Sequence, residues 1–316
     1  MELNKLLQLA PVYRDYVWGG QRLRPGQLTA EAWVVYESDV IANGPLAGRT
    51  LAEVSREFGE KLLGHTAVQR TGHRFPLLIK LLDCAQWLSL QVHPNDEQAR
   101  LLEGPDQFGK TEAWHIIEAQ PGSRLIAGLQ SGIVPDQAAE AIRDGTIIDL
   151  VQYHAIQPGD SLFMAPGTIH ALGPGLLLYE VQQSSDLTYR VYDWGRPQTE
   201  SRKLHIDKSL AVVDAKGSSK PVALKVDPST DHQPLIACPY FTLEYLHGNE
   251  HAIAMHTRQT SFHVITTIRG SASIQAGDES LELERFATVL VPAFAGSYTI
   301  QPRGDCALLK SSVEII

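Results

Sequence analysis

The sequence predicts a mainly β protein made of two antiparallel β sandwiches or barrels with a few decorating helices. Short apolar or alternating runs of strand length recur along the chain, separated by Gly, Pro, Asn and Asp, which is the pattern of antiparallel sheets. Helical signals are few, and they do not alternate with the strands. The clearest strand runs in the first part of the chain are 31–38, 76–83, 113–119, 124–129, 161–166 and 176–183.

Four segments carry helical signals. In the first, Thr50 is a plausible N-cap and Gly64 a plausible residue just past the last turn. The others combine good helix formers with Pro, Asp or Gly near their ends. The predicted helices are 50–64, 96–103, 135–145 and 207–215.

A connection between two domains is predicted after the last helix. Residues 214–234 are rich in Gly, Ser, Pro and charged residues, so we expect one domain over 1–225 and a second, smaller one over 226–316. The second domain again alternates with period 2, in 262–277 and 289–300. It echoes the first, but Tyr298 or a neighbour stands where the first offers His170. We therefore expect the second sandwich to be free of metal.

Composition excludes several classes of protein. The chain has 316 residues, 43% of them hydrophobic, which is enough for a sizeable core. Its apolar runs are shorter than the roughly 20 residues of a membrane span, and its start is acidic where a signal peptide would be basic, so the cytoplasm is the expected location. A net charge of −9 argues against a nucleic-acid partner. Three widely spaced cysteines indicate neither disulfides nor a thiolate metal site.

The stretch 88-LSLQVHPNDEQAR-100 places two polar side chains on one face of a strand. Residues i and i+2 of a strand point the same way, so Gln91 and His93 project together, opposite to Leu90 and Val92. Such a pair is more often solvated or hydrogen-bonded than bound to a metal. The rest of the chain must decide between these readings.

Two further polar residues, Glu112 and His170, stand at strand or turn positions. With Gln91 and His93 they form a set of two imidazoles, one carboxylate and one amide, which suits a borderline divalent ion such as zinc with a position left open. Iron, manganese or cobalt would also fit. The neighbouring His115 faces the other way from Glu112.

The chain resembles the cupin superfamily and, almost from end to end, the short bacterial type I mannose-6-phosphate (phosphomannose) isomerases. The resemblance implies two cupin-type jelly-roll domains, the first catalytic, that interconvert mannose 6-phosphate and fructose 6-phosphate in mannose metabolism with one Zn²⁺ per chain. It rests on the following segments, in this order: 17-VWGG-20, 31-EAW-33, 44-GPLAGRTL-51, 75-FPLLIKLLD-83, 88-LSLQVHP-94, 109-GKTEAW-114, 166-PGTIHAL-172, 180-EVQQSSDLTYRVYDWGR-196 and 204-LHIDKSL-210.

The same resemblance assigns roles to individual residues. It implies Arg190 as the active-site arginine and matches Lys110 to the lysine before the metal-binding glutamate. One departure is Leu172, where longer members of the family have a tyrosine. The implied metal ligands are Gln91, His93, Glu112 and His170, and the positions implied to line the substrate pocket are Trp18, Glu31, Ser89, Glu180 and Asp186.

Conversion of an aldose to a ketose needs a base, a group that stabilises the enediol(ate), and donors for the phosphate. A metal ion and the Arg190 guanidinium suit the second and third needs. Lys110 could serve as the base if it loses its proton, and Glu180, Asp186 or a hydroxide on the metal remain alternatives. The alternative, non-catalytic interpretation of Arg190 is a salt bridge with Asp186 or Asp193.

Two rival functions remain at this point. A cupin dioxygenase would bind a metal in the same way but would favour two histidines and would not need Arg190 or Lys110. A non-catalytic sugar-phosphate-binding cupin would keep the pocket without the chemistry. A second cluster, His247, His251 and His256, falls on mixed faces of an alternating segment and is expected to be solvated. The sequence does not indicate an oligomeric state.

Overall fold

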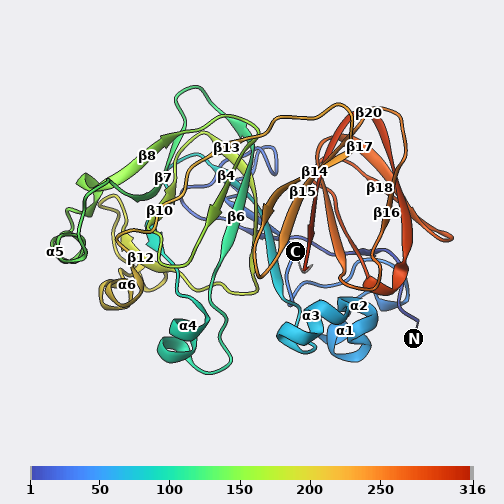
Figure 1. Cartoon of the computed structure of the whole chain (residues 1–316), viewed down its shortest axis with the longest axis horizontal. Coiled ribbons are helices and arrows are strands. Elements are labelled where there is room, and N and C mark those ends of the chain that lie inside the picture. Colours follow the sequence, from blue (N-terminus) through green and yellow to red (C-terminus); the bar gives the residue numbers. More distant parts are fainter. Residues whose placement is uncertain (1, 314–316) are drawn as a thin grey trace. The chain divides into compact units, whose positions relative to one another are not determined.

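The computed structural model describes residues 2–313 and is built mainly of antiparallel strands with short helices between them (Figure 1). The predicted fold class is therefore confirmed. No helix within the described range is both long and apolar enough to cross a bilayer. The α-helices are α1 (Leu51–Phe58), α2 (Glu60–Leu63), α3 (His65–Thr71), α4 (Asp96–Glu103), α5 (Pro135–Asp144) and α6 (Ile206–Val212), and the 3-10 turns are η1 (Gly44–Leu46), η2 (Ile147–Asp149), η3 (Glu200–Arg202) and η4 (Ala293–Ala295).

The chain divides into two compact units. The central unit comprises residues 13–32 and 80–224, and the terminal unit comprises the described residues 2–12, 33–79 and 225–313. The N-terminal segments belong to the terminal unit because β1 (Leu7–Gln8) pairs with β19 (Thr288–Val291) and α2 packs on η4. The limits 1–225 and 226–316 stay a prediction for functional domains, which this division by contacts does not test.

The central unit contains a five-stranded sheet in the order β12-β5-β10-β7-β8 and most of a seven-stranded sheet in the order β13-β9-β6-β11-β4-β3-β2. The strands of the first sheet are β5 (Leu90–Val92), β7 (Arg124–Leu129), β8 (Val151–Ala155), β10 (His170–Leu172) and β12 (Tyr189–Tyr192). Those of the second are β2 (Val12–Arg14), β3 (Glu31–Val35), β4 (Leu77–Cys84), β6 (Glu112–Ala119), β9 (Asp160–Met164), β11 (Leu176–Gln183) and β13 (Val222–Ala223).

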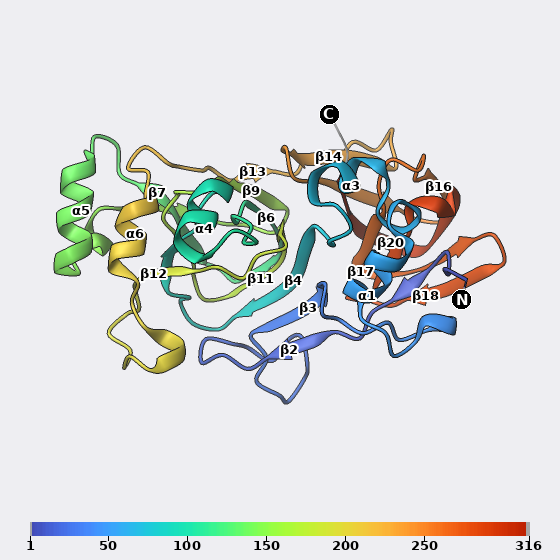
Figure 2. The same cartoon turned by 90° about the horizontal axis from the view of Figure 1, so that it is seen from below.

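Alternation along the strands separates two apolar layers in the central unit. Leu125 and Ala127 point from β7 into the core between the sheets, with Trp114 and Leu172. Ile126, between them, points to the opposite face, where α5 and α6 cover the five-stranded sheet. Figures 1 and 2 both show these two helices side by side. Both faces of the five-stranded sheet are therefore buried, one against the second sheet and one against helices.

The terminal unit is a second antiparallel sandwich in which the strand order is β1-β19-β17-β20-β15-β14, with β16 on β20 and β18 on β17. Its inner face is apolar over Leu246, Ile265 and Leu308. The helices α1 to α3 form a cluster in this unit (Figure 1). The remaining strands are β14 (His232–Ala237), β15 (Thr242–Gly248), β16 (Ile253–His256), β17 (His263–Ala276), β18 (Glu279–Leu283) and β20 (Ser297–Ser312).

The predicted helices are present with one correction. The segment 50–64 is two helices rather than one, because Gly59 adopts a φ of 48° and ends α1. Thr50 caps α1, as predicted, and the structure adds a capping box with Glu53. Gly64 ends α2 and is followed directly by α3, which the sequence did not predict. The three cysteines are free and buried.

Candidate active site and metal centre

Three strands of the five-stranded sheet present polar side chains at one register position. Gln91 on β5 lies directly opposite His170 on β10 and opposite Arg190 on β12. Residues paired across neighbouring strands share a face of the sheet. That face is the inner one, because Leu172, two residues after His170, belongs to the core between the sheets. The strand order therefore brings Gln91, His170 and Arg190 together from distant parts of the chain.

The facing sheet supplies the carboxylates. Glu112 on β6 is paired with Gln182 on β11, and Trp114 is paired with Glu180. Trp114 belongs to the core between the sheets, so Glu112, two residues before it, points the same way. The Trp114 indole donates a hydrogen bond of 2.9 Å to Glu180, which fixes that carboxylate. His115 points to the opposite face and contacts the Ser161 hydroxyl at 2.9 Å.

His93, Glu112 and His170 form a buried cluster. Their nearest donor atoms all lie within 4.8 Å of one another, and the three residues are 2%, 0% and 1% exposed. His93 Nδ1 lies 2.8 Å from the Leu187 carbonyl, and His170 Nδ1 lies 2.9 Å from that of Thr168. Because a carbonyl only accepts, each Nδ1 carries the proton and each Nε2 turns a lone pair toward Glu112. This arrangement fixes the tautomer that a metal-binding imidazole needs.

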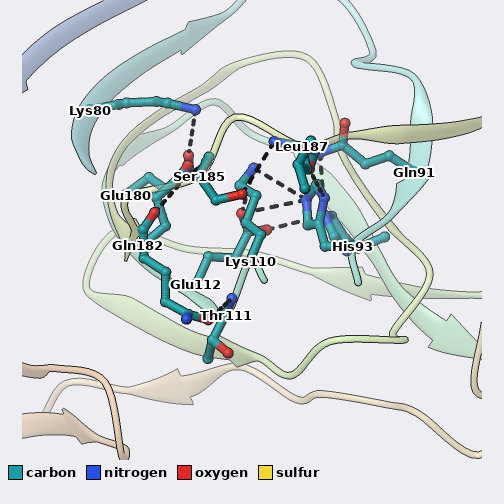
Figure 3. Close-up of polar contacts among 12 residues, drawn as sticks. Lys80, Gln91, His93, Lys110, Thr111, Glu112, Glu180, Gln182, Ser185 and Leu187 are labelled. Carbon is teal, nitrogen blue, oxygen red and sulfur yellow. Dashed lines mark hydrogen bonds and ion pairs between the residues drawn. The ribbon is translucent and has the colours of Figure 1, made fainter. Parts of the chain in front are cut away.

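Glu112 has an unusual electrostatic environment (Figure 3). Both of its oxygens are buried and neither accepts a hydrogen bond of good geometry, although His170 Nε2 is 3.1 Å from Oε1 and Lys110 Nζ is 3.0 Å from Oε2. Burial alone would raise the pKa of Glu112, but the neighbouring positive charge, that of the Lys110 ammonium above all, outweighs it and holds this pKa well below the ordinary value. Burial and the Lys110 ammonium lower the pKa of His93 well below 6.5. A neutral imidazole and an ionised carboxylate thus face each other.

This donor set fits a divalent cation. Two imidazole lone pairs converge on a carboxylate whose oxygens lack hydrogen bonds. The Lys110 ammonium, 3.2 Å from His93 Nε2, offsets the negative charge of Glu112 only on the side of His93. The Gln91 amide nitrogen lies 3.2 Å from His170 Nε2, and a half-turn of this amide presents its oxygen instead. Imidazole, carboxylate and amide oxygen are all ordinary ligands of zinc and related metals.

A pocket of about 460 Å³ opens beside the cluster, entirely within the central unit. This volume suits a small polar metabolite. Leu172, where longer family members have a tyrosine, also lines it. Most of the site residues expected from the sequence line this pocket. They are Trp18, Glu31, Ser89, Gln91, Lys110, Glu180, Asp186 and Arg190.

Lys80 is a pocket residue that sequence reasoning missed. Its side chain is 4% exposed, and Nζ lies 3.1 Å from Glu180 and 3.9 Å from Glu31 (Figure 3). Burial works against the charged form, but Glu180 and Glu31 outweigh it and raise the pKa of Lys80. Lys80 is therefore a permanent cation at neutral pH. The signal was present in the sequence, since 76-PLLIKLLD-83 has a lone lysine inside an apolar strand.

Arg190 is placed in the pocket and not in the salt bridge considered from the sequence. Its Nη1 donates to the Lys203 carbonyl at 3.0 Å. Asp193 instead pairs with Arg196 and Arg202, at 3.2 and 2.5 Å. Burial, and then Arg202, lower the pKa of Arg190 from its ordinary value.

Two more residues that the sequence did not single out, Arg202 and His205, join Arg190 at this end of the pocket. They follow β12, with Arg202 at the end of η3 and His205 directly before α6, where no periodic pattern marks them. With Arg190 they make one end of the pocket rich in donors for an anion.

The chain has two β sandwiches, and one of them holds a buried imidazole–carboxylate cluster beside a polar pocket. These features are typical of an enzyme of the cupin type with a metal site. The model of the phosphomannose isomerase type I catalytic domain matches residues 6–115. Mannose-6-phosphate isomerase ManA of Bacillus subtilis (strain 168) is 33% identical over 310 residues, covering 94% of this chain and 96% of that protein.

Solved structures agree with this match. The crystal structure of mannose 6-phosphate isomerase from Bacillus subtilis has a TM-score of 0.84 at 30% identity and covers 98% of this chain and 99% of that one. A zinc-bound mannose 6-phosphate isomerase, 15% identical with a TM-score of 0.74, shares the fold over 97% of this chain and 99% of its own. The chain belongs to the type I mannose-6-phosphate isomerase family and is an isomerase that acts on a phosphosugar.

Proposed function

We propose that this chain interconverts D-mannose 6-phosphate and D-fructose 6-phosphate in the pocket of the central unit, with one zinc ion held by Gln91, His93, Glu112 and His170. The observation that carries the proposal is the convergence of two Nε2 lone pairs on the buried Glu112 carboxylate beside this pocket. A solved relative of the same fold is zinc-bound, which supports zinc over other divalent metals. The cytoplasm remains the expected location.

The bound ion would supply Lewis-acid stabilisation of the charge that develops on the sugar oxygens. The chain's own residues prepare the site for it. The backbone carbonyls of Leu187 and Thr168 orient the two imidazoles, so little rearrangement is required on binding. The fit of the donor set extends to iron, manganese and cobalt, so the metal is best identified by analysis of the purified protein.

The reaction moves a hydrogen from C2 to C1 of the open-chain sugar and a proton between O2 and O1, so no external oxidant or reductant is required. Among the candidate bases, Glu180 is engaged by Trp114 and Lys80, and Asp186 is exposed at the pocket wall. Lys110 is 4% exposed and lies closest to the metal cluster. We therefore assign the C2-to-C1 transfer to Lys110 Nζ, which requires that the ammonium first releases a proton.

Arg190 and Lys80 act as fixed charges in this account. The Arg190 backbone lies opposite Gln91, and its guanidinium donates to the Lys203 carbonyl. It is placed to donate to the enediolate or to phosphate oxygens with planar, permanently charged N–H groups. Lys80 holds Glu180 and Glu31 in place and keeps a positive charge in the pocket during the reaction.

A coupled assay that follows fructose 6-phosphate formation from mannose 6-phosphate tests the proposal. The purified chain should turn over, lose activity after dialysis against a chelator, and regain it when zinc is added back in one equivalent. Lack of turnover in the zinc-loaded protein would reject the isomerase assignment. Full turnover in protein shown to be free of metal would reject the metal's role while leaving the substrate assignment intact.

A further inference from the structure

The terminal unit contains a cavity of its own, of about 740 Å³, lined only by residues of that unit. It lies at the polar end of the sandwich interior. Leu308 and Leu246 pack in the apolar core, and two residues further along the same inner faces come Lys310 on β20 and Glu244 on β15. The interior of this sandwich therefore changes from apolar to polar along its strands, as it does in the central unit.

The polar end of this interior is built from buried side chains. Lys310 and Glu244 are paired across the two strands, with Nζ 2.8 Å from the carboxylate. His263 on β17 contacts the Tyr298 hydroxyl at 2.7 Å, and the two residues are 1% and 3% exposed. All four line the cavity. These paired polar side chains border open space instead of apolar packing, an arrangement found at sites that bind polar ligands.

The rim of the cavity carries a strained turn. Arg258 and Gln259 have φ values of 52° and 60°, which residues other than glycine rarely adopt, and Thr260 N–H donates to the Thr257 carbonyl to close the turn. The start of α3 holds this turn, because Thr66 N–H donates to the Thr260 carbonyl. A side chain at Gly64 would meet Thr260 O at 2.4 Å, which explains a glycine there. Strained backbone held by its surroundings is concentrated at binding sites.

We propose that this cavity is a second binding site, separate from the isomerase pocket, for a small hydroxylated anion of the sugar-phosphate class. Its cations, Lys310 and Arg258, outnumber its one carboxylate, Glu244, and that carboxylate is already paired with Lys310. Arg258 thus adds positive charge at the rim for a phosphate group.

The other lining groups favour a sugar over a bare ion or a metal. Hydroxyls of Tyr298, Thr66 and Ser297 offer hydrogen bonds to sugar hydroxyls, and the volume exceeds what a phosphate ion fills. Among the described residues, the three metal-binding side chains that converge are His93, Glu112 and His170 of the central unit, and no such set lies around this cavity. The class of ligand is therefore an organic anion with several hydroxyl groups.

Methionine methyl groups provide a built-in test of this proposal. The chain has three methionines. Met164 lies in the core of the central unit, on β9 opposite Glu112, and Met255 lines the terminal cavity. In the zinc-loaded full chain with ¹³C-labelled methionine methyls, titration with glucose 6-phosphate should shift the Met255 signal in a saturable way. Inorganic phosphate should shift it more weakly, and the uncharged polyol glucitol should leave it in place.

Two variants assign the shift to the cavity. Arg258→Asn removes the charge with a residue that tolerates left-handed backbone, and it should weaken the Met255 response at least tenfold while leaving the Met164 signal unchanged. Lys310→Met combined with Glu244→Gln removes both members of the buried pair and should have the same effect. Arg303→Gln, which removes an exposed arginine paired with Glu282 in the same unit, is the matched control and should bind normally.

The outcomes separate this proposal from the isomerase account. A Met255 signal that does not move with glucose 6-phosphate overturns the second site, whatever the activity of the enzyme. A response that survives Arg258→Asn, or that glucitol reproduces in full, overturns the assignment to an anion. A Met255 response that persists in Arg190→Lys, a variant of the catalytic pocket, shows that the two sites are independent.

Discussion

The polar interiors of the two sandwiches differ in how their charges are compensated. In the terminal unit, Lys310 faces Glu244 and His263 faces Tyr298, so donors and acceptors are matched in pairs. In the central unit, the Nε2 lone pairs of His93 and His170 turn toward Glu112, so acceptors converge and Lys110 offsets them only in part. Polarity alone does not make a metal site. What distinguishes the central unit is an excess of acceptors that a cation would satisfy.

The largest expected effect is loss of the metal. Replacing His93 or His170 with Ala removes one of the converging lone pairs, so bound zinc should fall well below one per chain and activity should be lost with it. Altering even an outer partner of a metal ligand costs about 10- to 100-fold in affinity, so loss of the ligand itself should cost at least about 100-fold. Elemental analysis and the coupled assay measure both. Stoichiometric zinc in both variants would refute the ligand assignment.

The next effect concerns two buried lysines, Lys80 of the central unit and Lys310 of the terminal unit. Lys80→Met leaves Glu180 and Glu31 without their shared cation and should lower the free energy of unfolding by about 3–5 kcal/mol, as for other broken buried pairs. Lys310→Met, the matched variant, leaves one carboxylate, that of Glu244, without its partner and should lower the free energy of unfolding by less. Urea unfolding of both variants measures the difference. If Lys310→Met lost as much unfolding free energy as Lys80→Met, or more, Lys80 would not be the lysine that compensates the greater buried negative charge.

Arg190 separates catalysis from metal binding. Arg190→Lys keeps the charge but removes the planar fork, so turnover should fall about 10²- to 10³-fold, which corresponds to about 3–4 kcal/mol, while zinc content is unchanged. Arg303→Lys, in an exposed ion pair of the terminal unit, is the control and should keep full turnover. We would measure kcat, KM and zinc stoichiometry. Turnover within about threefold of the parent with zinc intact would return Arg190 to a supporting role.

Acid should act on the central unit through His115. Burial lowers the pKa of His115 to about 4, so the folded state prefers the neutral ring. Between pH 6.5 and 4 the unfolded chain binds the proton more readily, so stability present above about pH 6.5 is lost as the pH falls. The loss amounts to about 3 kcal/mol by linkage. His115→Gln should flatten the stability profile in this window, whereas His251→Gln, at an exposed site, should not. Superimposable profiles for all three proteins would contradict this.

The smallest expected effect is none. Among the described residues, His247, His251 and His256 of the terminal unit are not part of a convergent set of metal-binding groups, and the last two are exposed. Replacing all three with Gln should leave zinc content at one per chain. A drop in bound zinc would mean that the terminal unit contributes a site, and it would remove the contrast between the two sandwiches.

Much of this arrangement could be predicted from local patterns. Period-2 alternation indicated the strands, Thr50 indicated a helix start, and the i, i+2 spacing of Gln91 and His93 placed them on one face. Glu112 and His170 followed from polar residues at strand or turn positions and from the family resemblance. These signals lie in short stretches of sequence, where backbone geometry alone fixes which side chains share a face.

Other features depend on tertiary contacts that no local pattern records. Arg202 and His205 reach the pocket because the segment after β12 returns to it, and α3 exists where Gly64 allows its close approach to Thr260. The N-terminal segments join the terminal unit through pairing of β1 with β19, nearly 300 residues apart (Leu7↔Leu290). Lys80 was visible as a charge in an apolar strand, but its meaning required knowing that Glu180 and Glu31 lie beside it.

The most direct test of the central claim is an anomalous difference map recorded at the zinc absorption edge from crystals of the protein grown with zinc. We expect one strong peak per chain, within bonding distance of His93 Nε2, His170 Nε2 and the Glu112 carboxylate, with the Gln91 amide oxygen turned toward it. Absence of a peak at this position, or a peak of equal strength in the terminal cavity, would contradict it.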